Sequence, residues 1–109
     1  MNDRIRERIA EEVAACNEVS DLHGVTTAKL QSHLVVPPRR SRFSYQLAQL
    51  RGECWMWVVV DEQPGTGDGY LVVYDGDRDE FCLAMKGTAA NVGCVVGWYD
   101  SLHDALIAM

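Results

Sequence analysis

The fold is decided by residues 53–85, whose sequence is ECWMWVVVDEQPGTGDGYLVVYDGDRDEFCLAM. This stretch holds three short apolar runs, at 54–60, 70–74 and 81–85, which are rich in β-branched and aromatic residues. A Gly-rich segment separates the first two runs, and an acidic segment separates the last two. Short apolar runs punctuated by Gly, Pro and Asp are typical of strands joined by tight turns. The pattern predicts an antiparallel β-meander.

The first of these runs is apolar on both of its alternating sides. Trp55, Trp57 and Val59 fall on one side, and the residues between them are also apolar. A strand with one face in water would show polar residues at every second position, so this pattern predicts a central strand covered on both faces. Each face of such a sheet must pack against another apolar layer, and the helices predicted for this chain are short. Either the N-terminal helices divide between the two faces, or an aromatic patch remains exposed for a partner or a second copy of the chain.

The segments on either side of the sheet have helical patterns. Apolar residues recur at helical spacing over 3–17 and again, in a shorter segment, over 28–34. Ser101 is placed to cap a helix over 101–109, where Leu102 and Leu106 lie on one side. Residues 42–50 fit both a strand and a helix, and we favour a strand because residues 51–52 then form a short turn into the next one. A further strand is predicted over 92–99.

These elements predict one α+β domain over residues 1–109, because a chain of this length forms a single domain. The expected fold class is an antiparallel β-meander of four to five strands, with N-terminal helices and a short C-terminal helix packed on it. We expect a helical N-terminal part at 1–35, the sheet at 42–99 and the C-terminal helix at 101–109.

Composition narrows the class of protein. The chain is 48% hydrophobic and has a net charge of −6, which argues against disorder and against general affinity for nucleic acid. Its longest wholly apolar run, 55–60, is too short to span a membrane, and its charged N-terminus lacks the features of a signal peptide. The four cysteines form no Cys-x-x-Cys pair and are expected to be reduced. These observations predict a soluble cytoplasmic protein with no membrane partner.

No motif of catalysis or metal binding is complete. Asp75, Asp77 and Asp79 have the spacing that opens an EF-hand calcium loop. However, Glu80 stands at the position of the required Gly, and Lys86 at the position of the bidentate Glu. The three histidines and four cysteines match no zinc spacing, and no nucleophile motif occurs. We predict no catalytic residue, no metal and no cofactor.

Two sets of residues are candidates for binding. The first set combines the aromatic residues of the strands with the acidic residues of a turn, and it predicts a surface for protein–protein interaction: Trp55, Trp57, Tyr70, Tyr74, Asp75, Asp77 and Asp79. The second set is a cluster of arginines on a predicted loop, which could bind an anion through its guanidinium groups: Arg39, Arg40 and Arg42.

The C-terminal half contains the segments GYLVVYD at 69–75, FCLA at 81–84 and GWYDSLHDAL at 97–106. In the turn and cap residues of these segments the chain resembles small bacterial proteins of the toxin-immunity kind. The resemblance implies a compact, acidic α+β domain that neutralises a toxin by binding it. It assigns no role to any single residue.

Our first expectation is therefore a small acidic intracellular domain that is not an enzyme and acts by binding a protein partner or a second copy of itself. The alternative is a domain or enzyme that binds a small anionic molecule in a pocket between the sheet and the arginine loop. A third, weaker alternative is a helix-turn-helix regulator that presents Lys29, Gln31 and His33 to DNA. The acidic net charge disfavours this third alternative.

Overall fold

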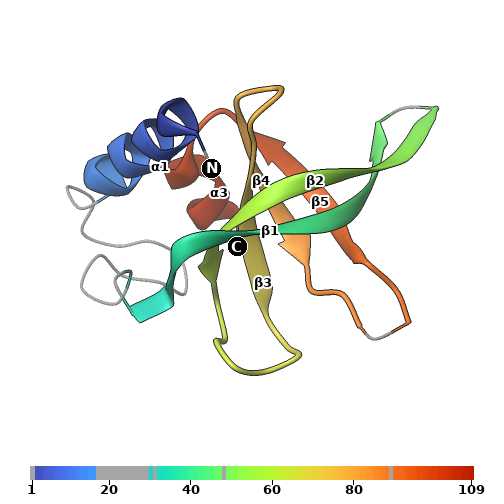
Figure 1. The fold of residues 1–109 in the computed structure, drawn as a ribbon. Coiled ribbons are helices and arrows are strands. Elements are labelled where there is room, and N and C mark those ends of the chain that lie inside the picture. The colour runs from blue at the N-terminus through green and yellow to red at the C-terminus, as the bar shows by residue number, and fades with distance from the viewer. Residues whose placement is uncertain (1, 17–29, 31, 48, 89) are drawn as a thin grey trace.

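The computed structural model describes residues 2–16, 30, 32–47, 49–88 and 90–109. Two helices and five strands are assigned in these residues (Figure 1), and the predicted α+β class is confirmed. The elements follow one another along the chain in this order: α1 (Asp3–Cys16), β1 (Leu34–Leu47), β2 (Leu50–Asp61), β3 (Tyr70–Asp75), β4 (Glu80–Met85), β5 (Gly93–Tyr99) and α3 (Leu102–Ala108).

The sheet is a closed barrel rather than the open meander that the sequence predicts. Each strand is antiparallel to the next, in the order β1-β2-β3-β4-β5. The first and last of five alternating strands run in the same direction, and β1 and β5 close the barrel by a short parallel pairing of Phe43 with Gly93 and of Ser44 with Cys94. Gly93 permits this closure, since a Cβ there would lie 2.7 Å from the Phe43 ring and 2.6 Å from the carbonyl oxygen of Met85.

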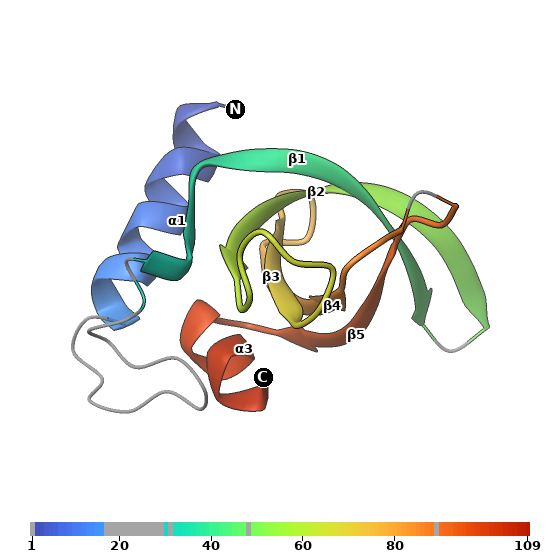
Figure 2. The same cartoon turned by 90° about the horizontal axis from the view of Figure 1, so that it is seen from below.

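Closure divides the apolar residues into an inner and an outer core. The inner core fills the barrel, so its residues leave no open channel: Phe43, Met56, Val58, Leu71, Val73, Cys82, Ala84 and Val95. The outer core lies between the barrel and the helices and includes Ile9 of α1 and Leu102 and Leu106 of α3. Figure 2 shows both helices on one side of the barrel, with the far end of the β1–β2 hairpin extending from the other side.

Strand β2 lies between β1 and β3, which confirms its predicted central place. The prediction that it is covered on both faces is wrong for its first half. Met56 and Val58 are buried inside the barrel, whereas Trp55 on the outer face is 54% exposed. A closed barrel presents its whole outer surface to be covered, and the two helices reach only one side of it.

A β-bulge in β2 reverses the direction of its side chains near its end. Val58 pairs with Val73 and Val60 pairs with Val72, so Val59 is an extra residue in the ladder. Beyond the bulge Asp61 pairs with Leu71, a residue of the inner core. Asp61 therefore faces the inside of the barrel at its end.

Both terminal helices are confirmed. In α1 the backbone N–H of Ile5 donates to Asn2 Oδ1 at 2.9 Å, and in α3 the N–H of Asp104 donates to Ser101 Oγ at 3.1 Å. Ser101 is the cap that the sequence pattern indicates, and Asn2 belongs to the residue types that commonly cap helices.

The N-terminal boundary of the sheet is corrected. Residues 42–47 are strand, as favoured, Gln49 lies in a turn, and residue 48 lies outside the described residues. However, β1 begins at Leu34, inside the range expected to be helical, and residues 51–52 belong to β2 rather than to a turn. Residues 28, 29 and 31 of the expected second helix, and with them Lys29 and Gln31, lie outside the described residues, while Leu30, Ser32 and His33 are helical. Pro37 and Pro38 are accommodated in β1 because they fall where its register with β2 shifts.

Candidate binding surface

Two arginines of β1 and two tryptophans of β2 form one face on the outside of the barrel. Arg40 is paired with Trp57 across the two strands, and Arg42 is paired with Trp55. The guanidinium carbon of Arg40 lies 5.5 Å from the centre of the Trp55 ring and 6.0 Å from that of Trp57, and that of Arg42 lies 5.8 Å from Trp55. Cations at these distances from an indole are attracted to its face. We call these four residues the Arg–Trp face.

The hairpin that carries the Arg–Trp face is positively charged. The β1–β2 hairpin, residues 34–61, contains four arginines and two acids, Glu53 and Asp61, which gives a charge of +2, and the remaining residues must then carry −8 to give the net −6. Glu53 lies 3.2 Å from Arg42, and both side chains are nearly half exposed. The sign of the charge on this hairpin is thus opposite to that of the whole chain.

Two hollows border the face. The first, which we call the α1-side groove, has a volume of about 480 Å³ and lies between the start of α1 and the outer side of β2, where Arg4, Tyr74 and Asp77 contribute to its walls. The second, which we call the barrel-mouth cavity, has a volume of about 770 Å³ and lies between β1, at Arg39, and the loops that contain Gly67 and Asn91. Arg40 and Trp55 line both hollows. They form a ridge between them.

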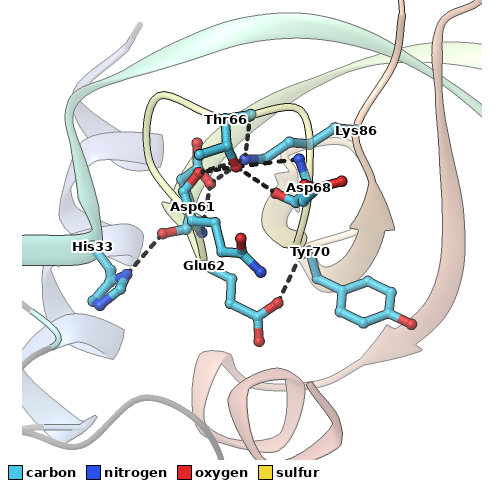
Figure 3. Close-up of polar contacts among 8 residues, drawn as sticks. His33, Asp61, Glu62, Thr66, Asp68, Tyr70 and Lys86 are labelled. Carbon is cyan, nitrogen blue, oxygen red and sulfur yellow. Dashed lines mark hydrogen bonds and ion pairs between the residues drawn. The ribbon is translucent and has the colours of Figure 1, made fainter.

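The predicted interaction residues do not form a single surface. Trp55, Trp57, Tyr74 and Asp77 line the α1-side groove together. Tyr70 lines neither hollow; it begins β3, where its backbone N–H donates to Glu62 Oε1 at 3.1 Å (Figure 3).

Two of the three predicted acids are engaged within the protein. Asp75 is buried, and its Oδ1 accepts the backbone N–H groups of Asp77 at 3.0 Å and Arg78 at 3.3 Å. Asp79 Oδ1 accepts the Tyr74 hydroxyl at 2.6 Å and Arg8 Nε at 2.9 Å. These carboxylates shape the β3–β4 turn and attach it to α1. The Asp77 side chain lies in the groove wall and makes no hydrogen bond or ion pair with a described residue.

The Tyr74–Asp79 contact alters the acidity of both groups. The hydrogen bonds from Tyr74 and then Arg8 lower the pKa of the Asp79 carboxyl, because they stabilise its ionised form. Burial, followed by the hydrogen bond to Asp79, raises the pKa of Tyr74 to about 12. The pair is most stable with the phenol protonated and the carboxyl ionised.

The prediction that the three arginines lie on a loop is wrong. Arg39, Arg40 and Arg42 lie on strand β1 and not on a loop. All three line the barrel-mouth cavity, so the structure brings them together beside a hollow. Arg39 pairs with Val58, a residue of the inner core, which places Arg39 on the inner face of β1 while Arg40 and Arg42 are on the outer face.

Sequence reasoning missed the ion pair of Lys86 with Asp61. Lys86 Nζ lies 2.7 Å from Asp61 Oδ1 and donates to the carbonyl oxygens of Gln63 at 2.8 Å and Thr66 at 2.9 Å (Figure 3). These bonds hold the β2–β3 loop at the end of the barrel. A lysine after one strand and an aspartate at the end of another carry no signal that pairs them, and the bulge that turns Asp61 inward is not visible in the sequence pattern.

In the described part of the chain, no three His, Cys, Asp or Glu side chains are placed to hold one metal ion together. No helix in this part combines the length and the apolar character that crossing a membrane requires. Comparisons of the chain with protein-family models, with curated proteins and with solved structures gave no match.

Proposed function

We propose that this chain is a protein-binding domain without catalytic activity and that the Arg–Trp face contacts an acidic partner. The observation that carries the proposal is the packing of Arg40 and Arg42 over Trp55, whose side chain is nevertheless 54% exposed. A large aromatic ring that is held by its neighbours and open to solvent is suited to bury its free surface against another molecule.

The residue types support a protein partner. Tryptophan and arginine are enriched among the residues that contribute most to protein–protein affinity. Here two arginines on β1 lie opposite two tryptophans on β2. Because Trp55 is already contacted by two guanidinium groups, little side-chain freedom remains to be lost on binding.

The local charge supports an acidic partner. Arg40 has no carboxylate partner among the described residues, and Arg42 has one exposed partner, Glu53. Such exposed ion pairs contribute little stability and are readily exchanged. Charges farther away than about 8–10 Å are screened at physiological salt, so a partner at this face meets the local positive charge rather than the net charge of −6.

Photo-crosslinking provides the test. A photo-reactive residue at Asp77, in the wall of the α1-side groove, is expected to capture a partner in cells that express the chain. The same residue at Val96, which is exposed on β5 and lines neither hollow, is expected to capture none. Equal capture at both positions, or none at 77, would overturn the proposal.

The purified partner then allows a quantitative comparison. Trp55→Ala is expected to raise its dissociation constant at least tenfold, because a central tryptophan contributes about 2 kcal/mol or more to many interfaces. Val96→Ala removes an exposed apolar side chain elsewhere and is expected to leave the affinity unchanged. A second copy of the chain, captured in this way, would support the proposal in its self-association form. A toxin with an acidic surface would support the toxin-immunity form.

A further inference from the structure

We propose that the barrel-mouth cavity is a second binding site, which takes a small ligand carrying a phosphate or carboxylate group, with Arg39 as its main charged contact. Arg39 does not belong to the Arg–Trp face, so the two sites differ in their main contact residue. It goes beyond the proposed function because its ligand is a small anion and not a protein.

The cavity exists because the barrel closes over a short distance. β1 pairs with β5 at Phe43 and Ser44, and residues 39–42 have no described strand on the side away from β2. The opposite wall comes from the β2–β3 and β4–β5 loops, to which Gly67 and Asn91 belong. The volume of about 770 Å³ is within the range of small-molecule sites.

The charge of the cavity is strongly positive. Its described lining contains four basic side chains and one acid, which leaves +3: Arg39, Arg40, Arg42, Lys86 and Asp61. Asp61 is held by Lys86 at 2.7 Å, so its charge is already compensated and does not neutralise an arginine (Figure 3). Arg42 is paired with Glu53 at 3.2 Å, outside the lining, so Arg39 and Arg40 are the two arginines of the cavity that have no carboxylate partner among the described residues.

Arg39 differs from its two neighbours. Arg40 and Arg42 lie over tryptophan rings, whereas Arg39 has no hydrogen bond, ion pair or ring contact with any residue that the structure describes. Its cross-strand partner Val58 is buried in the barrel, so Arg39 is on the inward side of β1 at the mouth of the barrel. A planar guanidinium group with all its donors free matches a phosphate or carboxylate, which it binds through two parallel hydrogen bonds.

Uncharged groups around the cavity complete a site of this chemistry. Ser41 is on the same side of β1 as Arg39, and its hydroxyl makes no hydrogen bond with any residue that the structure describes. Thr88 Oγ1 accepts the backbone N–H groups of Ala90 and Asn91, which leaves its own O–H available to donate. Val92, which is exposed, provides apolar surface for the rest of the ligand.

The proposal is tested by titrating the isotope-labelled full chain with inorganic phosphate and, separately, with succinate, at constant ionic strength and against sodium chloride. We expect at least one of the two anions to give saturable amide shifts at Gly67 and Asn91 and no comparable shift at Gly76 in the α1-side groove. Saturation by phosphate alone assigns a phosphate ligand, and saturation by succinate alone assigns a carboxylate. Shifts that do not saturate, or that chloride reproduces, would overturn the proposal.

Two substitutions of the same kind sharpen the test. Arg39→Gln is expected to raise the dissociation constant of the saturating anion at least tenfold. Arg51→Gln, on the same hairpin but outside the cavity lining, is expected to leave it unchanged. Equal effects of the two substitutions would contradict the role of Arg39. Arg39→Gln is also expected to leave crosslinking from position 77 unchanged. The proposal for this cavity and the proposal for the Arg–Trp face are therefore tested independently.

Discussion

Lys86 and Asp61 form an ion pair at the mouth of the barrel, with 2.7 Å between Lys86 Nζ and Asp61 Oδ1. Their side chains are 9% and 12% exposed, so both charges are largely withdrawn from water. The remaining donors of Lys86 are used by the carbonyl oxygens of Gln63 and Thr66, and Asp61 Oδ1 also accepts the N–H of Gln63 at 3.1 Å. A buried pair that satisfies all its hydrogen bonds fixes the loop that forms one wall of the cavity.

Lys86→Met is expected to lower the free energy of unfolding by about 3 kcal/mol, because it leaves the carboxylate of Asp61 buried without its counter-charge. Urea unfolding measures this loss. The double variant Asp61→Asn, Lys86→Met is expected to lose less than the sum of the two single losses, since neither charge then remains alone. Additive losses in this cycle would show that the two groups do not interact.

Gly93→Ala is expected to destabilise the protein by about 1–3 kcal/mol, the usual cost of overpacking a well-packed site. A Cβ at this position would come within 2.6 Å of the Met85 carbonyl oxygen, which is backbone and cannot rotate away. Gly67→Ala is the matched control, because a Cβ there meets nothing within 4 Å. Urea unfolding is expected to leave the control within about 0.5 kcal/mol of the parent, as for most exposed substitutions. A loss of similar size in both variants would contradict the account of barrel closure.

The Tyr74–Asp79 contact predicts a specific dependence on pH. The lowered pKa of Asp79 means that its contribution to stability is present above the unfolded value of about 3.9 and is lost as the pH falls through the folded value. The raised pKa of Tyr74 means that its contribution is present below the unfolded value of about 10 and is lost as the pH rises through about 12.

Tyr74→Phe is therefore expected to raise the pKa of the Asp79 carboxyl, measured from the pH dependence of its carbon chemical shift. The hydroxyl that donates to Asp79 is that of Tyr74 and not that of Tyr70, so Tyr70→Phe is the control and is expected to leave that pKa unchanged. If Tyr74→Phe also leaves it unchanged, the hydrogen bond does not govern the acidity of Asp79.

The four thiols are expected to react with Ellman's reagent in the order of their exposure. Cys94 is exposed, Cys54 is partly buried, and Cys16 and Cys82 are fully buried. Burial raises the pKa of Cys16 to about 11 and that of Cys82 well above its usual range, which lowers the fraction of reactive thiolate. The native protein should show one fast thiol, and Cys94→Ser should abolish that phase. Rapid reaction of two or more thiols in Cys94→Ser would contradict the buried positions of the others.

The strands and terminal helices could be predicted from local patterns, because alternation and capping depend on neighbouring residues. The apolar runs that begin at Cys54, Tyr70 and Phe81 are the strands of the structure, and Ser101 caps the last helix. Closure could not be predicted in this way. It depends on one short contact of Phe43 with Gly93, fifty residues away in the sequence, and on the absence of a side chain at Gly93.

Only part of the candidate surface could be predicted, because the sequence gives the residue types but not the face of the sheet on which each side chain lies. Trp55, Trp57 and Tyr74 do line one groove, and Arg39, Arg40 and Arg42 do line one cavity. The sequence could not show that the arginines of β1 lie opposite the tryptophans of β2. This pairing makes the face positive in an acidic protein. It also could not show that Asp75 and Asp79 are engaged within the fold.

The most direct test of the central claim is the affinity of the crosslinked partner for two charge variants at two salt concentrations. The double variant Arg40→Gln, Arg42→Gln is expected to weaken binding at least tenfold and to reduce the loss of affinity that salt causes, while Arg51→Gln, an exposed arginine of the same hairpin that contacts neither tryptophan, has a much smaller effect on both. If the variants bind with equal affinity, or if salt does not weaken binding of the parent chain, the Arg–Trp face is not the surface that meets the partner.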